Sequence, residues 1–523
     1  QSSMIVENVQ SIVEEGSMGL AYYYFDILDV KKRTVGGLLS SLALSLYTCS
    51  PSNHTAVDQL YMKCKDGVSK PSSQQLEDLL KQLISGFKET YIVIDALDEC
   101  KEWQELLKLL KRIHGWQIDQ CHLLVTSRKE QIIVNSLRHV APKEIDLALM
   151  PVDNDIKKYI DEKLEESEEL ITLEPETKQH INKLLKAKAN GMFRWVACQI
   201  DALEYCANSP AALTRTLEML PKDLETTYDQ ILERIHPTNE MHAVKLLYWL
   251  VFAIEPLEME ELAIVVQINV EENGLDAEER LGSPKDIVKI CSSLVALSED
   301  RKVKLAHASV KEYFLKEPRR IGTRIIDPCD GDLEMAKHCL AYLHHPRKTG
   351  EEEYWETWTL PGYCGKLWHK HVLACKNEAA VKSQILMACD AESIAFENWK
   401  SWRKDVLWEF KQYYPETPLE HAAVSGLLEM VKWLIKSVIL KQGGNVNAHS
   451  GKYGNALQAA ASVGAKDIVE LLLDNGSDVN AQGGFYGNAL QAASFGGNKD
   501  IIELCEFHGW VLWQCLTSSI ISG

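Results

Sequence analysis

The stretch Tyr91-Ile-Val-Ile-Asp-Ala-Leu-Asp-Glu-Cys100 decides the fold of the first part of this chain. Its apolar, β-branched residues predict a short, buried strand, which ends in Asp95, Asp98 and Glu99. In a parallel sheet the carboxyl ends of the strands face a crevice, so these acids are predicted to point into a site. Carboxylates at one strand end repel one another unless a cation lies among them, and the usual cation is Mg²⁺ carrying nucleotide phosphates. The alternative is a buried strand followed by a solvated acidic helix cap, for which a single acid is enough.

Length, charge and cysteine content narrow the class of protein. A chain of 523 residues is too long for one core and predicts several domains. A formal net charge of −19 argues against DNA, RNA or an anionic membrane as the main partner, because each selects for clusters of Lys and Arg. No apolar run reaches the roughly 18 residues of a membrane-spanning helix, and no signal peptide is recognisable. The 14 scattered cysteines form no C-x-x-C pair, which favours the reducing cytoplasm.

Strands and helices alternate through the first part of the chain. Helices are predicted over 35–46, from Pro71-Ser72-Ser73 onward and through Arg112, and strands over 20–25 and 121–126, with a further candidate strand at 144–147. Such alternation is typical of an α/β fold with a parallel sheet.

A second strand end carries complementary chemistry. The strand predicted at 121–126 runs into Thr126, Ser127 and Arg128, and a guanidinium is suited to read a terminal phosphate. The alternative for Arg128 is a surface arginine at a strand end; the functional interpretation is favoured, and the acidic strand strengthens it. Phosphoryl transfer depends mostly on positioning and electrostatic stabilisation, and two such strand ends supply both.

These residues also carry a family resemblance. Ile92-Val-Ile-Asp-Ala-Leu-Asp-Glu99 resembles the Walker B motif of NACHT domains, which belong to the STAND signalling NTPases, and Leu123-Leu-Val-Thr-Ser-Arg128 resembles their sensor strand. The surrounding elements are similar to the NACHT domains of large NLR-like proteins of filamentous fungi. The resemblance implies that Asp95 holds Mg²⁺, mainly through water. It further implies that Asp98 and Glu99 orient or activate the attacking water and that Arg128 senses the γ-phosphate of ATP or GTP.

One part of the family pattern is missing. P-loop NTPases cradle phosphates with G-x-x-x-x-G-K-[ST], and no such motif occurs in the 523 residues. In the family this motif precedes a helix like the one predicted at 4–13, so we expect the sequence to be a fragment or an incomplete gene model. Without the strand that feeds the loop, the sheet is expected to have an internal gap with unpaired backbone groups. We therefore expect weak or absent nucleotide binding by this chain, and turnover stays open.

From about residue 151 the pattern is wholly helical. The stretch Leu220-Pro-Lys-Asp-Leu-Glu-Thr-Thr-Tyr-Asp-Gln-Ile-Leu232 resembles the LPxxLxxxYxxIL signature of the helical lid that follows NACHT cores. Residues 243–269 are similar to the winged-helix module of the same proteins, with a wing expected over 294–305. His307 follows this wing at a strand-to-helix turn. By resemblance it contacts the β-phosphate of bound ADP and stabilises a closed state, whereas the alternative is a histidine that caps the helix or packs beneath the wing.

A Trp- and His-rich helical connector is predicted over 332–414. Tryptophans in helices usually belong to a core. Cys364, His369, His371 and Cys375 supply two thiols and two imidazoles, but their spacing matches no known zinc module. Core packing is therefore favoured over a metal site here.

The C-terminal part contains an internal repeat. Tyr453-Gly-Asn-Ala-Leu-Gln-Ala-Ala-Ala461 recurs as Tyr486-Gly-Asn-Ala-Leu-Gln-Ala-Ala-Ser494, an offset of 33 residues, which is the ankyrin period. Thr417-Pro-Leu-Glu-His-Ala-Ala423 resembles the TPLHxA opening of an earlier repeat. The pattern departs after Leu504, where an aliphatic second helix is expected. Ankyrin repeats imply a protein partner.

Together these patterns predict a multidomain α/β plus α protein. Its predicted parts are an incomplete P-loop NTPase-type parallel sheet (a NACHT core lacking the P-loop) at 1–150, a helical lid at 151–240, a winged helix at 241–331, the connector at 332–414 and an ankyrin solenoid at 415–523. The implied function is NLR-like signalling: an ATP- or GTP-dependent switch is coupled to ligand or protein recognition by the ankyrin repeats and to homo-oligomerisation. The alternative is a nucleotide-independent ankyrin scaffold with a degenerate or truncated NTPase domain.

Overall fold

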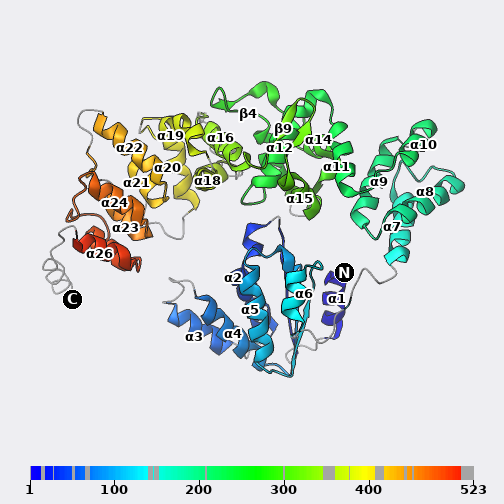
Figure 1. Cartoon of the computed structure of the whole chain (residues 1–523), viewed down its shortest axis with the longest axis horizontal. Coiled ribbons are helices and arrows are strands. Elements are labelled where there is room, and N and C mark those ends of the chain that lie inside the picture. Colours follow the sequence, from blue (N-terminus) through cyan, green and yellow to red (C-terminus); the bar gives the residue numbers. More distant parts are fainter. Residues whose placement is uncertain are drawn as a thin grey trace. The chain divides into compact units, whose positions relative to one another are not determined.

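The protein is described by a computed structural model that covers residues 2–12, 18–27, 29–49, 54–64, 71–138, 140, 145, 152–206, 209–298, 301–345, 360–375, 377–390, 392–406, 417–440, 445–449 and 453–507. This part of the chain is mostly helical, with small sheets. It forms two units, the first from 1–227 and 307–311 and the second from 228–306 and 312–523. Figure 1 labels helices and strands of both units. At the candidate strand 144–147 the structure describes only Ile145.

A three-stranded parallel sheet organises the first unit. Its order is β1 (Met18–Tyr24), β2 (Glu89–Asp95) and β3 (Cys121–Val125), so the acidic strand β2 is central. Tyr24 pairs with Asp95, and Ile94 pairs with Val125. The strands predicted at 20–25 and 121–126 are confirmed to within two residues. Within the described residues β3 pairs on one side only, and the predicted internal gap stays a prediction.

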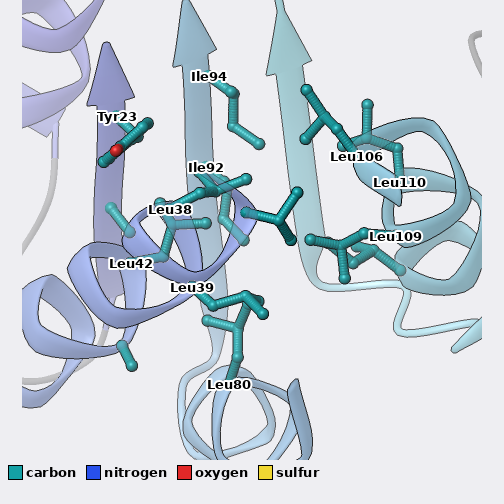
Figure 2. Packing of buried hydrophobic residues seen from close by; sticks show 14 of the residues in the cluster. Tyr23, Leu38, Leu39, Leu42, Leu80, Ile92, Ile94, Leu106, Leu109 and Leu110 are labelled. Atoms are coloured by element: carbon teal, nitrogen blue, oxygen red, sulfur yellow. The ribbon is translucent and has the colours of Figure 1, made fainter. Parts of the chain in front are cut away.

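Apolar side chains pack on both faces of this sheet. The larger cluster joins the sheet to helices α2 (Val35–Cys49), α4 (Ser73–Ser85) and α5 (Trp103–Gly115). Figure 2 shows Leu38, Leu80, Ile92 and Leu109 meeting there. A smaller cluster holds Val93 together with residues of β1 and of α1 (Ser2–Ile12). Because successive strand residues point to opposite faces, Ile92 and Val93 belong to different clusters.

A helical segment follows the sheet. The remaining elements of this region are α3 (His54–Lys63), α6 (Gln131–Leu137), α7 (Val152–Glu166), α8 (Pro175–Lys188), α9 (Phe193–Cys206), α10 (Pro210–Glu218) and α11 (Leu224–Glu233). Trp195 of α9 is fully buried, and its indole N–H donates to the carbonyl of Pro221 at 3.1 Å. The opening of the predicted lid motif, Leu220-Pro221, is thus fixed to α9.

The second unit opens with helices and short hairpins. These are α12 (Glu240–Phe252), α13 (Met259–Val265), β4 (Ile268–Asn269), β5 (Gly274–Leu275), α14 (Asp286–Cys291), β6 (Val295–Leu297), β7 (Val303–Leu305), α15 (Ala308–Lys316), β8 (Arg319–Ile321) and β9 (Arg324–Ile326). Residues 308–311 of α15 belong to the first unit. The wing predicted over 294–305 is confirmed as the antiparallel hairpin β6–β7. The hairpins β4–β5 and β8–β9 were not predicted, because strands of two or three residues are too short to show a period.

The predicted connector is helical and packed around aromatic side chains. It contains α16 (Gly331–Leu343), α18 (Leu360–Ala374), α19 (Lys382–Ala388) and α20 (Ile394–Val406). Trp368 and Trp399 are buried and lie edge to face at 5.1 Å. His371 is buried too, and its ring nitrogens contact Asp332 at 2.7 Å and the Tyr363 hydroxyl at 2.9 Å. Cys364, His369 and Cys375 are buried as well, which is the environment that core packing predicts.

Three helix pairs follow at the C-terminal side. They are α21 (Pro418–Val424) with α22 (Leu428–Leu440), α23 (Ala456–Val463) with α24 (Lys466–Asp474), and α25 (Ala489–Phe495) with α26 (Lys499–Phe507). Asn455 and Asn488 cap equivalent helices of two repeats, each accepting an N–H at 2.9 Å. Beyond Leu504, where the repeat pattern departs, the structure describes three more residues. Helix α26 continues to Phe507, because Cys505 is fully buried at a core position of the repeat.

Candidate functional site

A sharp turn follows the central strand and positions its acids. Ala96, directly after β2, has φ of 57°, in the left-handed region that residues with a Cβ rarely adopt. A single 3₁₀ turn, Leu97–Glu99, comes next. This turn places Asp98 and Glu99 at the same carboxyl edge as Asp95, at the end of the sheet where ligands of α/β proteins usually bind.

Asp95 is held by the neighbouring strand. The hydroxyl of Thr126, directly after β3, donates to Oδ1 of Asp95 at 2.5 Å. The same hydroxyl accepts the N–H of Ala96 at 3.0 Å, and the Thr126 carbonyl accepts the N–H of Leu97 at 2.9 Å. Thr126 therefore fixes both the carboxylate and the turn that carries the other two acids.

Asp98 is paired with Arg128. The backbone N–H of Arg128 donates to Oδ1 of Asp98 at 2.9 Å, and the guanidinium Nε lies 3.3 Å from Oδ2. The Asp98 side chain is 8% exposed, whereas that of Arg128 is 49% exposed. The two strand ends predicted to act together are thus in direct contact, and part of the repulsion among the acids is offset by a protein cation.

Glu99 holds a loop. Its Oε2 accepts the backbone N–H of Ile27, just beyond β1, at 2.7 Å. Burial raises the pKa of Glu99, and the charges of Asp26 and Asp98 act in the same direction, while the Ile27 N–H and Arg128 oppose them. One oxygen of the predicted catalytic Glu99 is therefore used to fix the loop after β1.

Lys311 in α15 was not singled out from the sequence, but it reaches the same loop. Its Nζ donates to the carbonyl of Ile27 at 3.2 Å, so Ile27 bonds Glu99 through its N–H and Lys311 through its carbonyl. The Lys311 side chain is buried, which lowers its pKa to about 8; the charge of Arg33 adds to this shift and that of Asp26 opposes it. The sequence alone suggests a solvated lysine on a helix, and no sequence pattern predicts the contact between Lys311 and Ile27.

His307 begins the helix that carries Lys311. It is exposed, and its Nδ1 accepts the backbone N–H of Ser309 at 3.1 Å and lies 2.7 Å from the Ser309 hydroxyl. This is the capping geometry of the alternative interpretation. The predicted contact with a β-phosphate stays a prediction, and the structure brings His307 into the same unit as Asp95, Asp98, Glu99 and Arg128.

The oxygen atoms of the acids at the end of β2 determine which metal ion could bind there. Asp95 and Asp98 offer carboxylate oxygens, the ligands that Mg²⁺ prefers. Within the described ranges, no group of three or more His, Cys, Asp or Glu side chains could hold a metal ion. In nucleotide enzymes Mg²⁺ is held by one or two carboxylates together with substrate phosphates, and the residues present fit that arrangement rather than a closed protein cage.

Three family models match parts of the chain. Nephrocystin 3, N-terminal, matches residues 1–128; the winged helix domain of GPI inositol-deacylase matches 237–323; and ankyrin repeats (many copies) match 457–504. These matches, with the fungal relative described next, fit a fungal NLR-like protein that combines a NACHT region with ankyrin repeats.

Two curated fungal proteins are similar to parts of this chain. The vegetative incompatibility protein HET-E-1 of Podospora anserina is 27% identical over 241 residues, which is 44% of this chain and 17% of the relative. The azaphilone pigments biosynthesis cluster protein L of Monascus ruber is 29% identical over 295 residues, which is 51% of this chain and 62% of the relative. The chain thus spans less than two thirds of either relative. Of the helices that the structure describes, none combines the length and apolar character needed to cross a membrane.

Proposed function

We propose that this chain is part of an NLR-like signalling switch, in which nucleotide and Mg²⁺ at the end of β2 control a state that the ankyrin repeats couple to a protein partner. The similarity to a vegetative incompatibility protein and the ankyrin repeats support signalling and protein recognition. Homo-oligomerisation of the opened form belongs to the same proposal.

The contact between the ends of β2 and β3 carries the proposal. Asp95 with Thr126, and Asp98 with Arg128, join two adjacent parallel strands at their carboxyl ends. A Mg²⁺ ion, when bound, would neutralise and orient phosphate oxygens there. Asp95 would hold it, mainly through water, and Asp98 with Glu99 would orient or activate the attacking water.

Arg128 would act as the sensor of the terminal phosphate. Its guanidinium already contacts Asp98, and a phosphate would compete with that carboxylate for the same N–H donors. Such a competition gives the two nucleotide states different contacts, which a switch requires. ATP and GTP remain alternatives, because no described contact reads a base.

Ile27 offers a route from the acids to α15. Glu99 bonds the N–H of Ile27, and Lys311 bonds its carbonyl. A change in the position of Glu99 would therefore reach α15, the helix that His307 caps. In this proposal His307 adds a contact to the β-phosphate of ADP, so its loss would shift the balance between closed and open forms.

The test compares the full chain with a version that carries a G-x-x-x-x-G-K-[ST] loop ahead of Gln1, since the 523 residues contain no such loop. Amide hydrogen exchange is followed over 92–99, 124–128 and 305–312 with Mg²⁺–ADP, Mg²⁺–ATP and Mg²⁺–GTP. The extended version is expected to bind at least tenfold more tightly and to gain protection in all three segments, and Asp95→Asn should remove the dependence on Mg²⁺. Absence of nucleotide-dependent protection in both versions would reject the switch and favour a nucleotide-independent ankyrin scaffold.

A further inference from the structure

Four aromatic rings gather on the surface of the last two described ankyrin repeats. They belong to Tyr453, Phe485, Tyr486 and Phe495 and are called the aromatic patch below. Phe485 is 54% exposed and Phe495 is 71% exposed. The ring of Tyr486 lies 5.2 Å from those of Phe485 and Phe495 and 6.3 Å from that of Tyr453. Large aromatic side chains that contact one another and still face water are typical of an interaction site.

The internal repeat shows that the two exposed phenylalanines are not needed for the ankyrin fold. The sequence Tyr-Gly-Asn-Ala-Leu-Gln-Ala-Ala occurs unchanged in both repeats, 33 residues apart. On either side of it the repeats differ: Phe485 stands where the preceding repeat has Lys452, and Phe495 stands where it has Ser462. Because the preceding repeat forms its helix pair with a lysine and a serine at these positions, the phenylalanines need another explanation than folding.

Glycines hold the aromatic patch in place. The N–H of Gly483 donates to the carbonyl of Gly487 at 2.8 Å, which closes the loop that carries two of the four rings. Gly484 in this loop has φ of 64°, and a Cβ there would lie 2.5 Å from the carbonyl group of Tyr453. The loop therefore packs directly on the backbone of the preceding repeat. Rings that are fixed before binding lose little conformational entropy when a partner arrives.

The surroundings of the aromatic patch carry no charge. Asp, Glu, Lys and Arg are absent from 453–465 and from 479–498, whereas the second helices α24 and α26 carry charges of both signs. An acidic or phosphorylated segment and a nucleic acid each require cations, which these stretches lack. A basic segment would find no carboxylate in them. The charge pattern thus matches an uncharged partner.

The exposed area limits the size of that partner. With about 200 Å² for a fully exposed phenylalanine, Phe485 and Phe495 together present about 250 Å². Tyr453 and Tyr486 are half-buried and add less. A stable protein interface buries roughly 800 Å² on each partner, so the aromatic patch suits a short segment better than a second copy of this chain.

The secondary structure of the repeats indicates how such a segment would bind. A segment that binds as an added strand needs a sheet edge, and the described part of the repeats contains no strand. A polyproline II segment needs no backbone partner, because its own N–H and C=O groups are solvated. Exposed aromatic side chains are the surface against which proline rings pack in such complexes.

We infer that the aromatic patch binds an uncharged, proline-rich segment of a protein partner in the polyproline II conformation. The proline rings pack against Phe485, Tyr486 and Phe495, and the uncharged surroundings exclude charged segments. Such binding rests on the protein recognition in the proposed function, for which it supplies the chemical class of the partner, and it needs no nucleotide.

The probe is a decapeptide of proline, titrated into the full chain by calorimetry without nucleotide. A decapeptide of alternating glycine and serine and an amphipathic helical peptide are the controls. Polyproline is expected to bind saturably with a Kd below about 1 mM, and both control peptides at least tenfold more weakly.

Two variants carry the residues of the preceding repeat. Phe485→Lys and Phe495→Ser should each weaken polyproline binding tenfold or more. Tyr61→Ser changes an aromatic residue of α3 that is 56% exposed and lies in the first unit, and it should change binding less than twofold. Hydrogen exchange over 456–507 checks that the repeats of each variant are folded, and Phe495→Ser decides the question if Phe485→Lys is not.

The assignment is overturned if polyproline does not bind saturably up to 5 mM, or if either control peptide binds as tightly. It is also overturned if Phe495→Ser retains the affinity of the parent, or if Tyr61→Ser loses as much affinity. A dimer in sedimentation that dissociates in Phe495→Ser would assign the aromatic patch to a second copy instead. Nucleotide-dependent protection over 92–99 is measured separately, so a failure here is distinct from a failure of the switch.

Discussion

Arg128 contacts Asp98 twice, through its backbone N–H at 2.9 Å and its guanidinium Nε at 3.3 Å. One contact fixes the backbone at the end of β3, and the other engages the side chain proposed to sense phosphate. Asp98 thereby links the two strand ends, and its replacement should weaken the structure at both.

Replacing Asp98 by Asn keeps the shape of the side chain and removes its charge. We expect amide protection of 94–98 and 124–128 to fall by about 1–2 kcal/mol, the scale of a hydrogen bond to a charged group, reduced because Arg128 is half exposed. Hydrogen exchange followed by mass spectrometry measures this directly. Asp119→Asn, at an exposed position before β3, is the control and should leave protection unchanged. Equal protection in the Asp98 variant and the parent would show that the pair contributes nothing to the strand ends.

Thr126→Val removes the hydroxyl that bonds both Asp95 and the Ala96 N–H. Because this leaves a part-buried N–H without its partner, the free energy of local opening around β2 should fall by about 1–3 kcal/mol. Thr126→Ser retains the hydroxyl and should recover most of the loss. Hydrogen exchange of 94–99 compares the two, and a Ser variant as weak as the Val variant would mean that the methyl group, not the hydroxyl, matters.

Lys311→Met tests the buried ammonium through pH. The unfolded chain keeps the Lys311 proton up to pH about 10.5, but the folded chain only to about 8. In that window the unfolded state binds more protons, so the contribution of Lys311 makes the parent more stable as pH rises. The Met variant lacks this term. Its Tm relative to the parent should be highest near pH 7 and should decrease steadily between pH 8 and 10.

The control for that experiment lies on the same helix. Lys316→Met changes an exposed lysine near the end of α15, and its Tm difference from the parent should not vary with pH over the same range. A Tm difference for Lys311→Met that is equally flat from pH 7 to 10 would contradict a buried, charge-destabilised Lys311.

Asn488→Ala removes the cap of α25 in the last described repeat. The side chain accepts the Gln491 N–H at 2.9 Å, and loss of such a cap typically costs about 0.5–2 kcal/mol. Asn488→Ser keeps a capping oxygen, so its free energy of unfolding should fall by at most a few tenths of a kcal/mol. Urea unfolding of the ankyrin helices, followed by hydrogen exchange over 456–507, measures both. An Ala variant as stable as the parent would exclude a role for the cap in holding the repeats.

Much of the architecture followed from local patterns. The β-branched run before Asp95 predicted the central strand, the 33-residue offset predicted the paired helices, and the wing was predicted at the position of β6–β7. A strand or helix shows its own period of buried residues within about a dozen positions. The ankyrin repeats add a second signal, because the same residues recur at a fixed spacing. Hairpins with strands of two or three residues were missed, because no period can be read from so few positions.

For the candidate site, the sequence predicted the residues but not their contacts. Residue type and strand-end position were enough to single out Asp95, Asp98, Glu99 and Arg128. Their partners were not predictable: Ile27 lies 72 residues before Glu99, and Lys311 lies 284 residues after Ile27. Backbone groups carry no side-chain signal, and a lysine on a helix is usually solvated.

The sequence by itself determined which chemical groups stand at the ends of β2 and β3, because strand pattern and residue type are local properties. Only the tertiary structure decided which partners those groups have. Asp98 pairs with Arg128, Glu99 accepts the N–H of Ile27, and the buried Lys311 donates to the carbonyl of Ile27. The physical reason is that burial and hydrogen bonding depend on which distant segments pack together, and both change the charge state and freedom of a side chain without changing its identity.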